Sequence, residues 1–257
     1  MTELHLTETG HGEPVLWLHG YTMDSSTWHP LWDRLPGWRH LGVDLPGHGG
    51  SPALRPGLTL PELADQLAEV LRASGARRVV ALSFGSMSAI QLAFQEPDLV
   101  DRLVLAAPTL AGTANEAAAK RRYQQLAMLY RLTGGASEQL ADLWLQSPPD
   151  IFKGTERHPE LRAALRAVVA RHGWAELGNG AMDRLTADRH TADQLRRISA
   201  RTLVVVGDQD MPAFVRNGEL LCATVPDCRL LTVADAGHLP LLERPDAVAA
   251  AIAEHLR

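Results

Sequence analysis

The stretch Val79–Met87, which reads VVALSFGSM, joins an apolar run to a helical pattern through one serine. A sharp strand-to-helix turn at this point lifts the hydroxyl of Ser83 above the end of the strand, where it can act as a nucleophile. The turn crowds the backbone, so the residues two before and two after the serine must be small, and they are Ala81 and Gly85. Ala81 departs mildly from the usual G-x-S-x-G pattern. The stretch predicts a catalytic serine, although a strand end followed by a serine helix cap gives a similar string.

Short apolar runs alternate with longer helical patterns on both sides of this stretch. The runs are rich in β-branched residues and leucine and are bounded by Gly, Pro or Asp, as is typical of buried parallel strands. They lie at Val15–Leu18, His40–Val43, Val79–Leu82, Leu103–Ala107, Leu203–Val206 and Leu230–Val233. Helices are expected near Thr27–Arg34, Leu60–Ser74, Phe84–Gln95, Pro212–Thr224 and Asp246–His255. The alternation predicts an α/β fold, with a mostly parallel twisted sheet flanked by helices and an edge strand at Thr2–Thr9.

The alternation breaks once, between Leu110 and Ile198, where no strand pattern occurs. This stretch is rich in Ala, Leu, Arg and Gln, and its Gly and Pro residues divide it into several helices. It is too long for a simple crossover between strands. We therefore expect a core of residues 1–109 and 199–257 and a helical lid of residues 110–198, inserted after the sixth apolar strand.

A serine nucleophile needs a base, and the base needs an acid that orients it. His238 follows a glycine just beyond the last predicted strand, and this position distinguishes it from the other histidines. Asp210 lies a few residues beyond the end of the preceding strand, from where its carboxylate could reach such a histidine. Asp208 and Asp210 could also form a turn or cap the helix that begins near Pro212.

The segment Val15–Tyr21 ends a strand in His19-Gly20 and opens a loop. Acyl transfer creates an oxyanion, which preorganised backbone N–H groups stabilise. We expect the two donors to be the amides of Tyr21 and Phe84, because Gly20 lets the backbone approach closely.

Five segments together resemble the α/β-hydrolase superfamily in its compact form with a helical lid. They occur in the family's order and spacing, and they cover nearly the whole chain apart from the lid: His19-Gly20-Tyr21, Asp44–Gly49, Ala81–Gly85, Gly207–Asp210 and Gly237-His238. The resemblance implies a Ser83–His238–Asp210 triad, with Tyr21 and Phe84 as oxyanion donors and a structural role for the Asp44–Gly49 turn. The chemistry it implies requires neither a metal nor a cofactor.

The residues around Ser83 narrow the resemblance. Haloalkane dehalogenases and epoxide hydrolases of this fold have Asp as the nucleophile. Enzymes similar to the menaquinone-pathway synthase have Arg where this chain has Met87, and C–C hydrolases of the meta-cleavage type usually have Asn in place of Leu82. The apolar Leu82 and Met87 favour a neutral or apolar group beside the serine, and we predict substrate contacts from both, from Leu239 and from Trp144 of the lid.

Polar and bulky residues of the lid leave other candidates undecided. The bulky side chains fill the lid core by default, although some must face the site: Tyr123, Met128, Tyr130, Trp144, Phe152, Trp174 and Met182. The lid arginines are by default a solvated helix face, and one of them could bind a substrate anion. Asp24 is a further undecided polar candidate.

These features predict a serine hydrolase that cleaves an ester or thioester of a small, largely apolar metabolite through an acyl-enzyme. One alternative keeps the site but changes the reaction to elimination, with loss of a carboxylate such as acetate, or to C–C cleavage in a biosynthetic pathway. A second alternative is a non-catalytic ligand-binding protein, which such folds produce mainly when a triad member is missing.

Composition limits the partners and the compartment. The 25 Lys and Arg against 30 Asp and Glu give a net charge of −5, and no basic stripe suggests nucleic-acid binding. The N-terminus lacks a signal-peptide pattern, and no apolar run reaches the roughly 18 to 20 residues that span a membrane. We therefore expect a cytoplasmic protein with a small-molecule substrate, no nucleic-acid partner, no membrane association and reduced thiols at Cys222 and Cys228. The sequence does not decide the oligomeric state.

Overall fold

A seven-stranded, mostly parallel sheet forms the centre of the protein in a computed structural model that describes residues 4–113 and 117–257. The strand order is β1-β3-β2-β4-β5-β6-β7. Only β1 is antiparallel, and it pairs with β3 at one edge. The strands are β1 (Leu6–Gly10), β2 (Glu13–Leu18), β3 (Trp38–Val43), β4 (Arg78–Leu82), β5 (Arg102–Ala106), β6 (Arg201–Gly207) and β7 (Cys228–Val233). The predicted fold class is thus confirmed, and the first two residues of the predicted edge strand, Thr2 and Glu3, lie outside the described residues.

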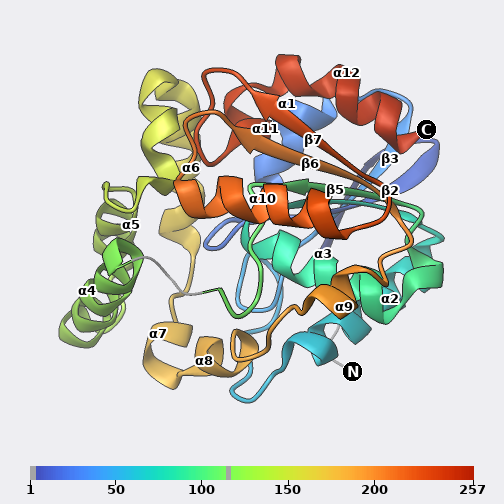
Figure 1. The fold of residues 1–257 in the computed structure, drawn as a ribbon. Helices are drawn as coiled ribbons and strands as arrows, with labels where there is room; N and C mark the ends of the chain where they lie inside the picture. Colours follow the sequence, from blue (N-terminus) through green and yellow to red (C-terminus); the bar gives the residue numbers. More distant parts are fainter. Residues whose placement is uncertain (1–3, 114–116) are drawn as a thin grey trace.

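Alternation along the strands divides the core into two, because successive side chains point to opposite faces of a sheet. In β4, Val79 and Ala81 join one core cluster, whereas Val80 and Leu82 join the other. Helices α2, α3 and α10 cover the first face, and α1, α11 and α12 cover the second (Figure 1). These helices are α1 (His29–Trp32), α2 (Leu60–Ser74), α3 (Phe84–Gln95), α10 (Pro212–Thr224), α11 (Pro240–Glu243) and α12 (Pro245–Leu256), and short 3₁₀ turns lie at Ser25–Trp28 (η1) and Pro97–Leu99 (η2).

Local end signals explain why several helices begin and end where the sequence predicts. Thr59 and Glu62 form a capping box at the start of α2, and Gly75 ends that helix in the left-handed conformation. The predicted helix at Thr27–Arg34 is instead the 3₁₀ turn η1 followed by α1, where Pro30 lies in the first turn. None of the helices in the described residues is long and apolar enough to span a membrane.

Helices alone fill the described part of the segment between β5 and β6, hereafter the insertion. Figure 1 shows α4 and α5 at one side of the molecule, away from the helices that cover the sheet. The insertion follows the fifth strand, β5, so its predicted place after a sixth strand is wrong. The difference arises because a single antiparallel strand, β1, precedes the parallel strands β2 to β5. The elements are α4 (Ala117–Thr133), α5 (Ser137–Trp144), η3 (Asp150–Arg157), α6 (Pro159–Arg171), α7 (Glu176–Asn179), α8 (Ala181–Leu185) and α9 (Ala192–Leu195).

The two cysteines form a disulfide, so the expectation of reduced thiols is wrong. Cys222 lies in the last turn of α10 and Cys228 is the first residue of β7. The turn between these elements brings the two Cα atoms to 4.9 Å, within the range that a disulfide requires. The C-x5-C spacing alone gave no sign of this reversal of the chain.

His190 joins the two ends of the insertion. Its side-chain Nδ1 accepts a hydrogen bond of 3.3 Å from the backbone N–H of Ala111, and the backbone N–H of His190 donates to the carbonyl of Ala111 at 3.0 Å. Burial lowers the pKa of His190 from 6.5 to about 4. Between pH 6.5 and about 4, the imidazole of His190 is therefore neutral in the folded protein, whereas in the unfolded chain it is protonated.

This histidine should make the fold sensitive to mild acid. Its stabilising effect is complete above pH 6.5 and is lost as the pH falls toward 4, because the unfolded chain binds the proton first. His190→Asn keeps an acceptor for Ala111 and removes the titration. Between these pH values, the urea unfolding free energy of the wild type should fall by up to about 3 kcal/mol more than that of the variant. The exposed His11→Asn serves as control, and parallel pH profiles of the wild type and His190→Asn would refute the assignment.

Candidate active site

Ser83 lies on a strained turn between β4 and α3. Its backbone has φ 50° and ψ −113°, in a region that residues other than glycine rarely adopt. Its N–H donates to the carbonyl of Ala106 at the end of β5, at 2.9 Å, and its carbonyl accepts the N–H of Ser86 at 2.9 Å. The side chain is partly exposed at the carboxyl end of the parallel strands. The structure thus has the elbow geometry that the sequence predicts.

Gly85 lets the start of α3 approach the end of β2. A Cβ at this position would lie 2.5 Å from the carbonyl oxygen of Leu18 and 2.6 Å from that of His19. Backbone carbonyls of a central strand cannot move aside as a flexible side chain can. The requirement for a small residue two positions after the serine therefore comes from contact between two pieces of backbone.

The structure brings Ser83, His238 and Asp210 together from three loops at the same edge of the sheet. The Nε2 of His238 lies 2.9 Å from the Oγ of Ser83, and the Nδ1 lies 2.9 Å from Oδ1 of Asp210. Both side chains of the His238–Asp210 pair are fully buried. Since a carboxylate only accepts, Nδ1 carries the proton and Nε2 can accept from the serine hydroxyl. Asp208 instead accepts from the N–H of Ala236 at 3.3 Å.

The N–H groups of Tyr21 and Phe84 are free to bind an anion. Phe84 is the first residue of α3, where backbone N–H groups have no partner within the helix. Within residues 4–113 and 117–257, neither N–H donates to another protein group. The loop that carries Tyr21 lies close to the serine, because a Cβ on Gly20 would lie 3.7 Å from the Cβ of Ser83. The assignment of these two amides as oxyanion donors stays a prediction.

Buried His19 fixes this loop. Its Nδ1 donates to the carbonyl of Gly20 at 2.8 Å, and its Nε2 accepts the N–H of Leu45 at 3.0 Å. Burial lowers the pKa of His19, so both bonds come from a neutral ring. The Asp44 carboxylate accepts from the N–H groups of Ser25 at 2.7 Å and Gly50 at 2.8 Å, which accounts for a structural role of its turn.

The sequence did not predict the buried hydrogen bonds that join Tyr21, in the loop after β2, to Glu176 and His172 of the insertion. The hydroxyl of Tyr21 donates to Oε1 of Glu176 at 2.6 Å, and Nε2 of His172 lies 2.9 Å from the same oxygen. Burial opposes ionisation of Glu176, but these hydrogen bonds outweigh it and lower the pKa of the carboxyl. Burial and the nearby Glu176 raise the pKa of Tyr21 well above its ordinary value of 10. The insertion is thus attached to the loop after β2.

The four predicted substrate contacts are not gathered on one surface. Leu82 and Met87 are buried in different core clusters, on opposite faces of the sheet. Leu239 is also fully buried. Trp144 lies against Tyr21, with ring centroids 5.6 Å apart, and its Nε1 donates to the hydroxyl of Thr22 at 2.9 Å. Contacts of these residues with substrate stay predictions.

Several undecided polar residues have structural partners. Asp24 caps η1 by accepting from the N–H of Ser26, and it forms an ion pair of 2.8 Å with Arg171. Arg166 pairs with Asp142 at 2.7 Å. Among the bulky residues, Trp174 and Phe152 are buried, whereas Met128 is 58% exposed.

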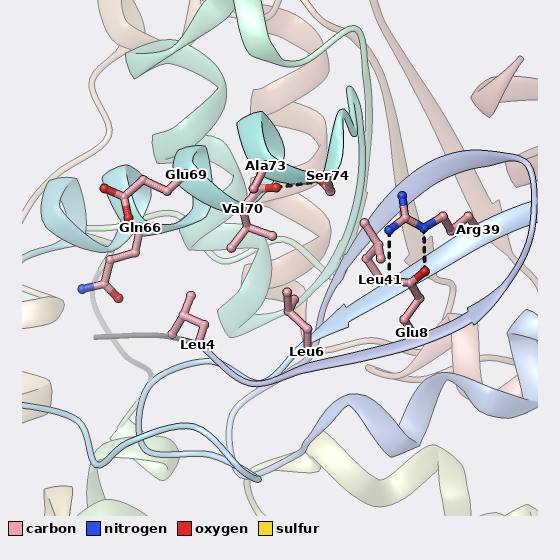
Figure 2. A pocket seen from close by; sticks show the side chains of 10 residues that line it. All are labelled: Leu4, Leu6, Glu8, Arg39, Leu41, Gln66, Glu69, Val70, Ala73 and Ser74. Carbon is pink, nitrogen blue, oxygen red and sulfur yellow. Dashed lines mark hydrogen bonds and ion pairs between the residues drawn. The ribbon is translucent and has the colours of Figure 1, made fainter. Parts of the chain in front are cut away.

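An open groove of about 470 Å³ lies elsewhere, between the sheet edge and α2. Figure 2 shows its apolar floor around Leu6, Leu41 and Val70, with Glu8 and Arg39 joined by hydrogen bonds at one end. Neither Ser83 nor His238 lines it. In the part of the chain that the structure describes, no group of three or more His, Cys, Asp or Glu is arranged to hold a metal ion.

A nucleophile elbow at the carboxyl edge of a mostly parallel sheet, facing a histidine and an acid that follow in the order Ser, Asp, His, defines an α/β hydrolase. Residues 15–251 match the model of the alpha/beta hydrolase family. The chain belongs to this family of enzymes, as the resemblance of its motifs implies.

Several named relatives of the chain are esterases or hydrolases. The pimeloyl-[acyl-carrier protein] methyl ester esterase of Nitrosomonas europaea is 29% identical over an alignment of 268 positions, which covers 96% of each protein. Among solved structures, a thermophilic esterase from Thermogutta terrifontis is 28% identical with a TM-score of 0.80, over 99% of this chain and 93% of that one. A hydrolase from Pseudomonas aeruginosa is 26% identical with a TM-score of 0.80, over 98% and 94%.

The close approach at Gly85 should make even one methyl group destabilising there. Gly85→Ala is expected to lower the unfolding free energy by roughly 1–3 kcal/mol, measured by urea denaturation, because the backbone of β2 and α3 must separate. Gly173→Ala is the matched control, since a Cβ at Gly173 meets no atom within 4 Å. Equal stability of the two variants would contradict the tight contact between α3 and β2.

Proposed function

We propose that this protein hydrolyses an ester or thioester of a small, largely apolar metabolite, with Ser83 as nucleophile. The observation that carries the proposal is the continuous chain of contacts from the Oγ of Ser83 through His238 to Asp210, each 2.9 Å long. Relatives over 25% identical that are named esterases support ester hydrolysis.

In the proposed first step, the Nε2 of His238 takes the hydroxyl proton of Ser83 while the Oγ attacks the carbonyl carbon. Asp210 holds Nδ1–H and stabilises the imidazolium that forms. The N–H groups of Tyr21 and Phe84 donate to the oxyanion. The tetrahedral intermediate then collapses, and the leaving alcohol or thiol receives the proton from Nε2.

In the second step, water resolves the acyl-enzyme. The neutral His238 takes a proton from a water molecule, whose oxygen attacks the acyl carbon. Collapse breaks the bond to the Oγ of Ser83, which regains its proton, and the acid leaves with one solvent oxygen. Every proton transfer uses the same imidazole nitrogen, so its distance to the serine controls both halves of the reaction.

The insertion is the proposed lid of this site. Trp144 and Glu176 belong to it, and they donate to Thr22 and accept from Tyr21, respectively, in the loop after β2. The position of these contacts beside the loop of Tyr21 supports a lid of residues 110–198 on a core of residues 1–109 and 199–257.

Loss of the serine hydroxyl should abolish turnover without unfolding the protein. Ser83→Ala is expected to lower kcat/KM for p-nitrophenyl butyrate by roughly 10³-fold or more, because triad members act as a unit. A fluorophosphonate probe should label the wild type at Ser83 and should not label the variant. Ser88→Ala is the control, since that buried hydroxyl has no hydrogen-bond partner in the described residues. Full activity of Ser83→Ala would favour a different site, and a wild type that neither turns over nor labels would favour a ligand-binding protein.

Isotope labelling separates hydrolysis from elimination. Hydrolysis through an acyl-enzyme places one solvent oxygen in the acid, whereas elimination cuts the alkyl C–O bond and leaves both original oxygens in the carboxylate. In ¹⁸O-water, mass spectrometry of the acid released from an alkyl ester with β-hydrogens should show one ¹⁸O atom. Unlabelled acid accompanied by an alkene would overturn hydrolysis and leave the Ser83–His238 pair in place.

A further inference from the structure

Glu243 is a buried carboxylate that holds the backbone on both sides of His238. Its Oε2 accepts the N–H of Gly237 at 2.7 Å, and its Oε1 accepts the N–H of Leu239 at 3.0 Å. The side chain is fully buried at the end of α11. Burial of a carboxylate is costly unless donors and a positive charge compensate it. The two N–H groups therefore stabilise the carboxylate, and the carboxylate fixes the histidine loop.

The compensating charge comes from the insertion. Arg157, at the end of η3, places Nη2 4.0 Å from Oε2 of Glu243. The same guanidinium donates to the carbonyl of Asp235 at 3.0 Å and to Oε1 of Gln209 at 2.6 Å. Asp235 lies in the loop of His238, and Gln209 precedes Asp210. One arginine thus contacts the loops that carry both members of the His–Asp pair.

The backbone of η3 packs directly on this ion pair. A Cβ on Gly154 would lie 2.0 Å from Oε2 of Glu243, and a Cβ on Gly237 would lie 3.2 Å from the Cα of Gly154. The loops of His238 and Asp210 are also joined to each other, because the N–H of Gln209 donates to the carbonyl of Ala236 at 2.9 Å. The 3₁₀ helix η3, the helix α11 and the loops of His238 and Asp210 are therefore tightly packed together.

We propose that Glu243 and Arg157 are positioning residues that hold the imidazole of His238 between Ser83 and Asp210. Glu243 fixes the peptide groups before and after the histidine. Arg157 contacts both the loop of His238 and the loop of Asp210 and so keeps the distance between the two loops fixed. Arg157 belongs to the insertion, so the placement of the insertion sets the alignment of the reacting pair. This inference rests on the proposed function.

Glu243→Gln tests the carboxylate with almost no change in shape. A glutamine has one acceptor oxygen, so its amide NH₂ must face one of the two backbone N–H groups, and the loop must shift. A small displacement of a reacting group lowers the rate steeply, so kcat for p-nitrophenyl butyrate should fall roughly 10- to 100-fold. KM should change less than about threefold, because Glu243 does not touch the substrate. Glu254→Gln, an exposed glutamate of α12, is the control and should match the wild type.

The hydrogen bond from His238 to Asp210 distinguishes positioning from general destabilisation. The charged groups in contact with the His238 loop are Asp208 and Asp210 after β6, Glu243 on α11 and Arg157 on η3. From α10, the apolar ring of Phe214 packs against the imidazole, with ring centroids 4.2 Å apart. A shift of the histidine loop in Glu243→Gln or Arg157→Gln should lengthen the 2.9 Å contact between Nδ1 of His238 and Oδ1 of Asp210. The proton NMR signal of the Nδ1–H group should therefore move upfield in both variants, because a longer hydrogen bond deshields its proton less.

The outcomes separate this inference from the proposed function. The NMR signal of the Nδ1–H group needs no turnover, so it tests the placement of Glu243 and Arg157 even if the wild type hydrolyses no ester. If the wild type is active but Glu243→Gln behaves as Glu254→Gln in kcat and in this NMR signal, the positioning role is overturned. If Glu243→Gln does not fold, Arg157→Gln decides, because that side chain is 44% exposed and its loss leaves no buried cavity. Arg197→Gln, on an exposed arginine, is its control.

Discussion

The close contact between the start of α3 and the ends of the neighbouring strands determines the geometry of the site. Ser83 has φ 50° because the chain must turn from β4 into α3 within one residue. On one side its N–H is bonded to the carbonyl of Ala106 in β5, and on the other Gly85 packs against the carbonyls of Leu18, the last residue of β2, and of His19, which follows it. Three central strands with core on both faces therefore support the strained residue. The position of the hydroxyl is a property of the sheet rather than of a loop.

Parallel pairing explains why residues far apart in the sequence meet at this point. The strands β2, β4, β6 and β7 run in the same direction, so the loops after them lie at one edge. Two buried glutamates then connect this edge to helices. Glu176 joins the insertion to Tyr21, and Glu243 joins α11 to the loop of His238. Each accepts at least two hydrogen bonds, as a carboxylate removed from water requires.

Much of this arrangement is predictable because its signals are local. The bounds of α2, α3 and α10 follow from caps, prolines and periodicity, and Ser83, Asp210 and His238 follow strands that the apolar runs reveal. Long-range features are not visible in the same way. The Cys222–Cys228 disulfide depends on the turn between α10 and β7. Leu82 and Met87 are close in sequence and both apolar, but the structure places them in core clusters on opposite faces of the sheet. Nothing in the local sequence indicates that the carboxylate of Glu243 faces the backbone on both sides of His238.

The acid of the site shows how burial and hydrogen bonding act together. Oδ1 of Asp210 accepts from His238 and from the N–H of Met211 at 2.7 Å, whereas no protein group in the described residues donates to Oδ2. Neutral donors leave most of the negative charge of a buried carboxylate uncompensated, and the low dielectric strengthens its field. The proposed serine attack creates a positive imidazolium 2.9 Å away. The charge of Asp210 is therefore better compensated in the transition state than in the resting state, and this difference is what accelerates a reaction.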